Sequence, residues 1–167
     1  YHNMKRRITV MRKIKKLVAT LLAATMVMAM GVTAFAADSL ADGKYTAKQN
    51  LYKNSACTTT SMGDAALNDM RAEITIADDE ATLVVHTHEI TYLGLTGHLG
   101  KMVVNGKTVT PKQTTTNGVT DYYFTFTGLD ASTIYEGCVI TGKFTTYVGS
   151  MPMNATGYLK LTDITAK

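Results

Sequence analysis

The sequence predicts an all-β sandwich of about eight strands, preceded by an N-terminal export signal. Polar and β-branched segments bounded by Gly, Asn and Asp recur roughly every ten to fifteen residues, a spacing typical of short antiparallel strands. Beyond residue 40, only residues 64–70 show a helical period, and that period is weak. At the N-terminus, a basic segment followed by an apolar run has the layout of a signal peptide.

Residues 1–36 are predicted to form this export signal. They hold seven of the 17 Lys and Arg residues and none of the 13 Asp and Glu residues. The apolar run Leu17–Val32 follows the basic residues, and Ala34–Ala36 supplies the small residues that a signal peptidase requires. The run is shorter than the roughly 18 residues of a membrane span, which favours cleavage over an uncleaved anchor. Translation is expected to start at Met11, with Met4 as the other choice.

Residues 37–167 are predicted to be the mature protein, a single secreted domain. Removing the signal leaves ten basic and thirteen acidic residues, a net charge of −3, which argues against nucleic-acid binding. The 131 remaining residues are enough to bury one hydrophobic core. We expect no membrane span in the mature chain and an extracellular location, either released or held at the cell surface by a partner.

Two tight turns and the alternation around them define the expected strands. Ala77–Glu80 breaks one hairpin, and Asn105-Gly106 predicts a type I′ turn because both residues tolerate positive φ. The expected strands are Gly43–Lys53, Arg71–Ala77, Ala81–Thr91, Leu99–Val104, Lys107–Thr110, Thr120–Thr127, Ile134–Val148 and Ala155–Thr162.

The last two strands are expected to form a terminal hairpin. Phe144 and Leu159 lie in the alternation that marks the core face. The tip, residues 149–154, places Met151 and Met153 on either side of a proline at an exposed turn, where their thioethers are available for contact. The alternation leaves four side chains on the outer face, namely Tyr147, Tyr158, Lys143 and Lys160.

The order of these features resembles the NEAT haem-binding domains, and most closely the Shp-type cell-surface haem proteins of Gram-positive bacteria, which share an immunoglobulin-like fold. The resemblance covers residues 42–164. Four pieces in order support it: residues 42–46 opening the first strand, the Ser61-Met62 loop, the run Met70–His88, and the closing hairpin Phe144–Leu161 with its Pro152-Met153.

The resemblance implies a haem b (iron protoporphyrin IX) site with methionine ligands. Ordinary NEAT domains ligate ferric haem through a tyrosine near the start of the last strand, but here Asn154 or Ala155 stands at that position. Shp-type proteins are understood to hold the iron between two methionines. By position these are Met62 and Met153, and Met151 is the rival of Met153.

The same resemblance implies how the haem is used. Tyr147 and Tyr158 are expected to pack along the macrocycle, and Lys160 or Lys143 could meet a propionate. Neutral, soft thioethers favour ferrous iron and require no deprotonation. A haem held in this way suits capture and transport for iron acquisition. The expected partners are other surface haem-transfer proteins or the binding protein of a haem transporter.

Other interpretations of the same residues stay open. His86-x-His88 places two imidazoles on one strand face, a pattern that fits either a partly buried structural pair or a metal site, and His98 or His88 is a minor alternative haem ligand. Cys57 and Cys138 either form a disulfide or stay free, with Cys138 buried.

The rival functional class is an adhesive or carbohydrate-binding module without haem, in which the outer tyrosines stack on sugar rings. No nucleophile–base motif and no phosphate-binding glycine loop are found in the sequence, so an enzyme is not expected.

Overall fold

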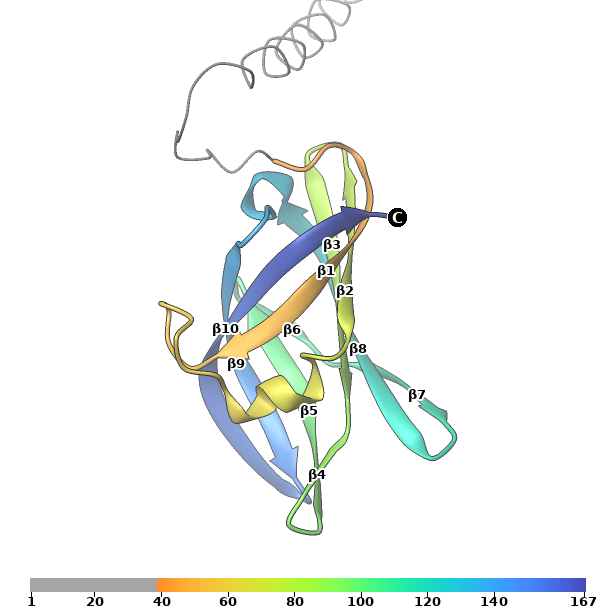
Figure 1. The fold of residues 1–167 in the computed structure, drawn as a ribbon, viewed down its shortest axis with the longest axis vertical. Helices are drawn as coiled ribbons and strands as arrows, with labels where there is room; N and C mark the ends of the chain where they lie inside the picture. Colours follow the sequence, from red (N-terminus) through yellow and green to blue (C-terminus); the bar gives the residue numbers. More distant parts are fainter. Residues whose placement is uncertain (1–38) are drawn as a thin grey trace, which may run out of the picture. The chain divides into compact units, whose positions relative to one another are not determined.

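Ten strands and two short 3-10 helices make up residues 39–167, the part of the chain that the computed structural model describes (Figure 1). The export signal predicted at residues 1–36 lies outside this part. The strand pairings are antiparallel, and the predicted all-β sandwich is confirmed. The elements are β1 (Gly43–Tyr52), η1 (Met62–Ala66), β2 (Arg71–Ala77), β3 (Glu80–His88), β4 (Ile90–Tyr92), β5 (Leu95–Val104), β6 (Lys107–Val109), β7 (Lys112–Thr116), β8 (Val119–Asp130), η2 (Ala131–Thr133), β9 (Val139–Val148) and β10 (Met151–Ala166).

One long strand, β10, joins the two layers of the sandwich. It pairs with β9 from Met151 to Lys160 and with β1 from Tyr158 to Ala166. The hydrogen-bonded order is β4-β5-β9-β10-β1-β2-β3-β8-β7, with β6 paired to β5. Because β10 belongs to both layers, the sheet folds back on itself along this strand. As a result, β3 lies close to β5 and β8 lies close to β6 (Figure 1).

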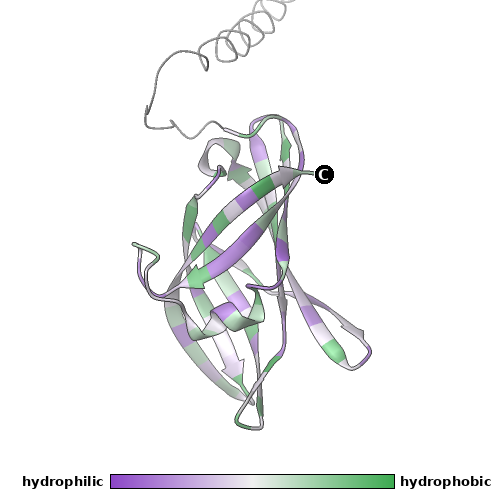
Figure 2. Cartoon of the chain, viewed as in Figure 1, coloured by the Kyte–Doolittle hydropathy of each residue, from purple (hydrophilic) through white to green (hydrophobic). Residues whose placement is uncertain are grey.

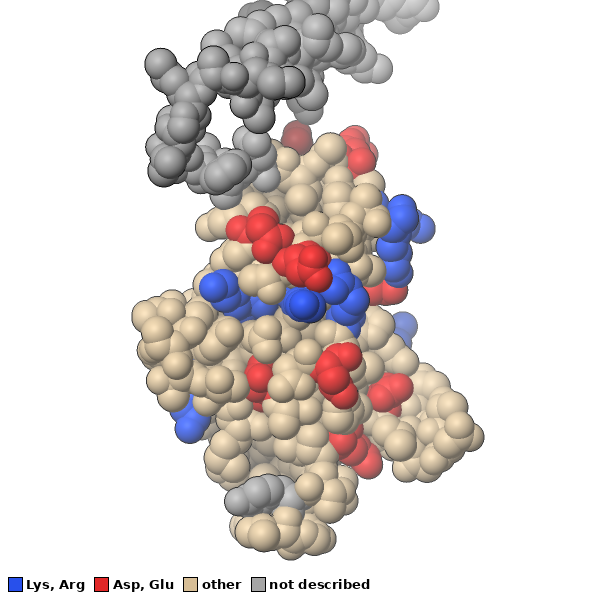
Figure 3. Space-filling model, viewed as in Figure 1, with Lys and Arg blue, Asp and Glu red and all other residues tan. Residues whose placement is uncertain are grey.

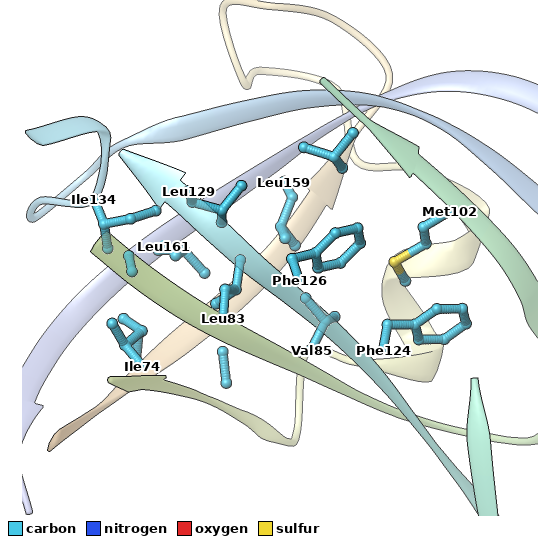
Figure 4. Packing of buried hydrophobic residues seen from close by; sticks show 14 of the residues in the cluster. Ile74, Leu83, Val85, Met102, Phe124, Phe126, Leu129, Ile134, Leu159 and Leu161 are labelled. Carbon is cyan, nitrogen blue, oxygen red and sulfur yellow. The ribbon is translucent and has the colours of Figure 1, made fainter. Parts of the chain in front are cut away.

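Apolar side chains from both layers meet in one core. In Figure 4, Met102 of β5 and Phe124 of β8 lie close together, and Leu159 of β10 lies in the same cluster. Along the strands these buried side chains alternate with polar ones, which Figure 2 shows as alternating green and purple segments. The alternation is a direct consequence of the two-residue period of a strand.

The number of strands differs from the prediction at two places. β7 was not predicted, because all five of its residues are exposed and it lacks the alternation of a half-buried strand. Its turn to β8 is Asn117-Gly118, with φ of +53° and +81°, so a second Asn-Gly hairpin signal was present in the sequence. The predicted strand 81–91 is divided at Glu89 into β3 and β4.

The two predicted turns are confirmed. Asn105 and Gly106 have φ of +50° and +73°, and Asp78 and Asp79 have φ of +52° and +66°. The weak helical pattern at residues 64–70 corresponds to the 3-10 helix η1, which starts two residues earlier. None of the helices in residues 39–167 is long and apolar enough to cross a membrane.

Candidate functional site

The helix η1 carries Met62 at its first position, on the connection from β1 to β2. Ser61 caps this helix, and its Oγ accepts a hydrogen bond from the N–H of Gly63 at 3.3 Å. The buried carboxylate of Asp64 accepts a hydrogen bond from the N–H of Leu51 at 2.6 Å, and two asparagine amides also donate to it. Hydrogen bonds to a charged acceptor are strong, so Asp64 fixes η1 against the end of β1.

Two further contacts hold the segment that follows η1. The amide Nε2 of the fully buried Gln49 donates to the carbonyl of Leu67 at 3.0 Å and to the carbonyl of His86 at 2.5 Å. The Nε2 of His88 lies 3.0 Å from Oδ1 of Asp69. The segment is therefore tied to β1 on one side and to β3 on the other.

The two methionines of the terminal hairpin belong to strand β10 itself. The turn contains only Gly149 and Ser150, and the glycine has a φ of +58°, as the first central residue of a type II′ turn does. The predicted six-residue tip at 149–154 is therefore wrong. Met151 pairs with Val148, and Met153 is 52% exposed although it is part of a regular strand.

The register places Met153 on the core face of its layer. Met153 pairs with Thr146 of β9, and Thr146 pairs on its other side with Leu99 of β5. Cross-strand partners point to the same face, so these three side chains form one row. Leu99 is fully buried, whereas Met153 is exposed. The core face thus continues beyond the core and becomes open to solvent at Met153.

Met62 lies on η1, which packs near the buried end of this row. A methyl group added to Gly63 would lie 3.7 Å from Cδ2 of Leu99, which places η1 against the row that runs from Leu99 to Met153. Two strand spacings, about 10 Å, separate the two ends of this row. Met62 is 68% exposed and Met151 is 63% exposed. We call the exposed Met151 and Met153 of β10, together with the exposed Met62 of η1, the methionine site.

Most of the other predicted contact residues lie on the opposite face of the hairpin. Tyr147 pairs with Pro152, Tyr158 with Thr141, and Lys160 with Val139. The register is consistent with the predicted outer face for Tyr158, Lys143 and Lys160. The ring of Tyr147 instead stacks on His98, which stacks on the buried Tyr122 of β8, so Tyr147 does not share that face. A flat ligand against Met153 does not reach the outer face, so the structure separates the predicted iron ligands from the predicted Tyr158 and lysine contacts.

Three aromatic rings from separate strands stack near the hairpin. The ring of His98 lies between those of Tyr122 and Tyr147, with centroid distances of 4.8 and 5.4 Å. Gly100 makes room for this stack, because a Cβ there would lie 2.3 Å from the ring of Tyr147. Burial, together with a hydrogen bond from its hydroxyl to Glu89, raises the pKa of Tyr122 to about 12. The stack ties β8 to β5 and β9.

The two histidines of β3 have different surroundings. No group of three or more potential metal-binding side chains occurs in residues 39–167. The buried Nε2 of His86 has no hydrogen-bond partner, its ring meets the ring of Tyr123 edge-on, and burial lowers its pKa.

His88 has hydrogen-bond acceptors at both ring nitrogens. Its Nδ1 donates to the carbonyl of Glu89 at 2.6 Å, and its Nε2 faces the carboxylate of Asp69. Burial by itself would lower the pKa of His88, but these two acceptors outweigh burial and raise it.

The two cysteines are free in the structure. Cys138 is buried just before β9, and burial raises the pKa of its thiol. Cys57 lies in the loop after β1 with a φ of +53°. Of the two alternatives considered, the one without a disulfide describes this structure.

The chain matches no protein-family model, and no curated protein matches it. The site therefore has to be interpreted from its own residues. Sequence reasoning pointed to Met62 and Met153 but not to Asp64, whose role depends on a tertiary hydrogen bond to the backbone of Leu51. The only local signal was a carboxylate placed three residues after Ser61.

Proposed function

We propose that this protein is a secreted haem-binding protein that holds haem b at the methionine site and captures or relays it for iron acquisition. The observation that carries this proposal is the exposure of Met62 on η1 and of Met153 on β10, two elements that both approach the buried Leu99 of β5. Large apolar side chains grouped at a surface typically mark a binding site. The resemblance to Shp-type haem proteins, noted from the sequence, supports the same assignment.

Met62 and Met153 are the proposed axial ligands of the iron. The strand register favours Met153 over Met151, because Met153 lies level with Leu99, which η1 contacts, whereas Met151 lies nearer the turn. Thioethers are neutral, so they stabilise ferrous iron more than anionic ligands do and their binding depends only weakly on pH.

The proposed role is non-catalytic transfer. A haem bound at an open surface stays accessible to a second protein, which suits exchange with surface haem-transfer proteins or with the binding protein of a haem transporter. Tyr158 and Lys160 lie on the other face of the hairpin and Tyr147 stacks on His98, so the proposed haem contacts do not include them.

The test is a haem titration of residues 37–167, followed by absorbance spectra with and without dithionite. We expect saturable one-to-one binding and a low-spin spectrum. Met62→Ala and Met153→Ala should each lower the affinity by more than about tenfold and give a five-coordinate spectrum, since the loss of a ligand exceeds the loss of a supporting group.

Met151→Ala is the matched control, because Met151 has similar exposure and lies on the same face of the same strand. We expect this variant to keep the parent spectrum. Equal binding by the parent, Met62→Ala and Met153→Ala would contradict the two-methionine site. An absence of binding would instead favour the alternative, an adhesive or carbohydrate-binding module without haem.

A further inference from the structure

The outer face of β1 and β10 carries a pair of tyrosines side by side. Tyr52 pairs with Tyr158 in the register between the two strands. Their neighbours Leu51 and Leu159 are buried in the core, so the alternation of the strands turns both tyrosines outward. Directly paired side chains lie about 5 Å apart at Cβ, so the two tyrosines are neighbours on this face, although their rings do not stack on each other.

Two lysines flank this aromatic pair. Lys160 lies two residues beyond Tyr158 along β10, and Lys143 lies two residues beyond the β9 partner of Tyr158 in the opposite direction. Each lysine is therefore about 7 Å from the level of Tyr158, one on either side. Among residues 39–167, no hydrogen bond or ion pair engages either lysine. Both cations are available to a ligand.

The two strands that carry Tyr158 and the lysines are poor in acidic residues. Residues 137–162, which include β9 and most of β10, contain no Asp or Glu, although residues 37–167 carry a net charge of −3. The nearest acidic residue along β10, Asp163, forms ion pairs with Arg71 and Lys48. Figure 3 shows Lys and Arg side chains gathered in a band across the middle of the molecule, with Asp and Glu side chains next to it. Neutral hydrogen-bonding groups, Thr141 and Thr156, stand beside the tyrosines and lysines.

We infer that this outer face, made of Tyr52, Tyr158, Lys143 and Lys160, binds a carboxylated polysaccharide. The two tyrosine rings offer an apolar platform for sugar rings, and the lysines on either side meet successive uronate carboxylates. Each lysine carries a compact positive charge that can pair with one carboxylate. The overall negative charge of the domain disfavours a polyanion that is held by charge alone.

This surface is separate from the methionine site, because the two lie on opposite faces of β10. Its occupant would retain the protein near an acidic glycan without covering Met62 or Met153. The inference therefore does not depend on haem binding, and each can fail without the other.

The test measures binding of residues 37–167 to polygalacturonate by titration calorimetry at low and at physiological salt. We expect binding that weakens with salt and that Lys143→Ala and Lys160→Ala each reduce by up to about fivefold. Tyr158→Ala should reduce it by about tenfold. Lys112→Ala, on the exposed edge strand β7, removes the same charge elsewhere and should leave binding unchanged.

Two further polymers separate the contributions of ring and charge. Methyl-esterified polygalacturonate keeps the sugar rings without the charge, and polyglutamate keeps the charge without the rings; both should bind more weakly than polygalacturonate. Equal binding of either polymer, tighter binding of single-stranded oligothymidine, no binding of polygalacturonate, or no effect of the two lysine variants would overturn the inference. Because the lysine side chains lie outside the core, Lys143→Ala and Lys160→Ala should fold, and they test the inference even if Tyr158→Ala fails to fold.

Discussion

The two faces of the β9–β10 hairpin are made from alternate residues of the same strands, yet they have different chemistry and different supports. One face carries Met151 and Met153 and continues the hydrophobic core into solvent. The other carries Tyr158, Lys143 and Lys160, and residues 137–162 contain no Asp or Glu. A single hairpin can therefore present two independent binding surfaces, because a strand alternates its side chains with a period of two.

The two surfaces also differ in what holds them. The outer face is built from paired strands alone, so its geometry is as rigid as the sheet. The methionine site needs a second wall, η1, which depends on the buried carboxylate of Asp64 and on contacts from Gln49 and His88. Changes far from either surface should therefore affect the methionine site and spare the outer face.

The largest expected effect is a difference in the free energy of unfolding between alanine variants of two methionines in the same layer. Met102 is fully buried opposite Phe144, whereas Met153 stands on the same face but is exposed. Met102→Ala should lower the free energy of unfolding by about 2–5 kcal/mol, because it leaves a cavity. Met153→Ala should change it by no more than about 0.5 kcal/mol. Urea unfolding followed by far-UV circular dichroism measures both, and similar losses would mean that Met153 belongs to the core.

A smaller effect should come from the support of η1. Asp64→Asn keeps the size of the side chain but removes the charge that accepts the Leu51 N–H, and should destabilise the domain by about 1–3 kcal/mol. It should also weaken haem binding by about tenfold without touching haem, as loss of a supporting group does. Polygalacturonate binding should be unchanged. Equal weakening of both ligands would show that the variant disturbs the whole sheet.

Much of the fold was predictable because the strands show it locally. The register of the hairpin follows from apolar residues such as Phe144 and Leu159, and the turns at Asn105-Gly106 and Asp78-Asp79 follow from residues that tolerate positive φ. The exposed strand β7 was missed because neither of its faces is buried and no alternation results.

The candidate site was less predictable, because its geometry is set by pairing between distant segments. The sequence indicated Met62 and Met153 as candidates. The face of the hairpin on which Met153 lies depends on where β10 begins, and the sequence did not show this. Reading residues 149–154 as a loop concealed that Met153 and Tyr158 lie on opposite faces. The role of Asp64 needs the end of β1 beside η1, which no local pattern reveals.

The smallest effect should appear as two opposite pH dependences on strand β3. Both ring nitrogens of His88 face acceptors, so its pKa is raised, and its stabilising contribution is complete below the usual value of 6.5 and is lost as pH rises through the raised pKa. His86 is desolvated and its pKa is lowered, so its contribution is present above 6.5 and is lost as pH falls through the lowered pKa.

The unfolding free energies of the parent, His88→Gln and His86→Gln should be compared between pH 5 and 8. The advantage of the parent over His88→Gln should shrink as pH rises, and its advantage over His86→Gln should shrink as pH falls. Only the first change should affect the methionine site, because His88 holds Asp69 next to η1, whereas the side chain of His86 faces Tyr123. If His88→Gln left haem affinity unchanged at pH 6, the contact between His88 and Asp69 would not support η1. Asp64 and Gln49 would then be sufficient to hold η1 in place.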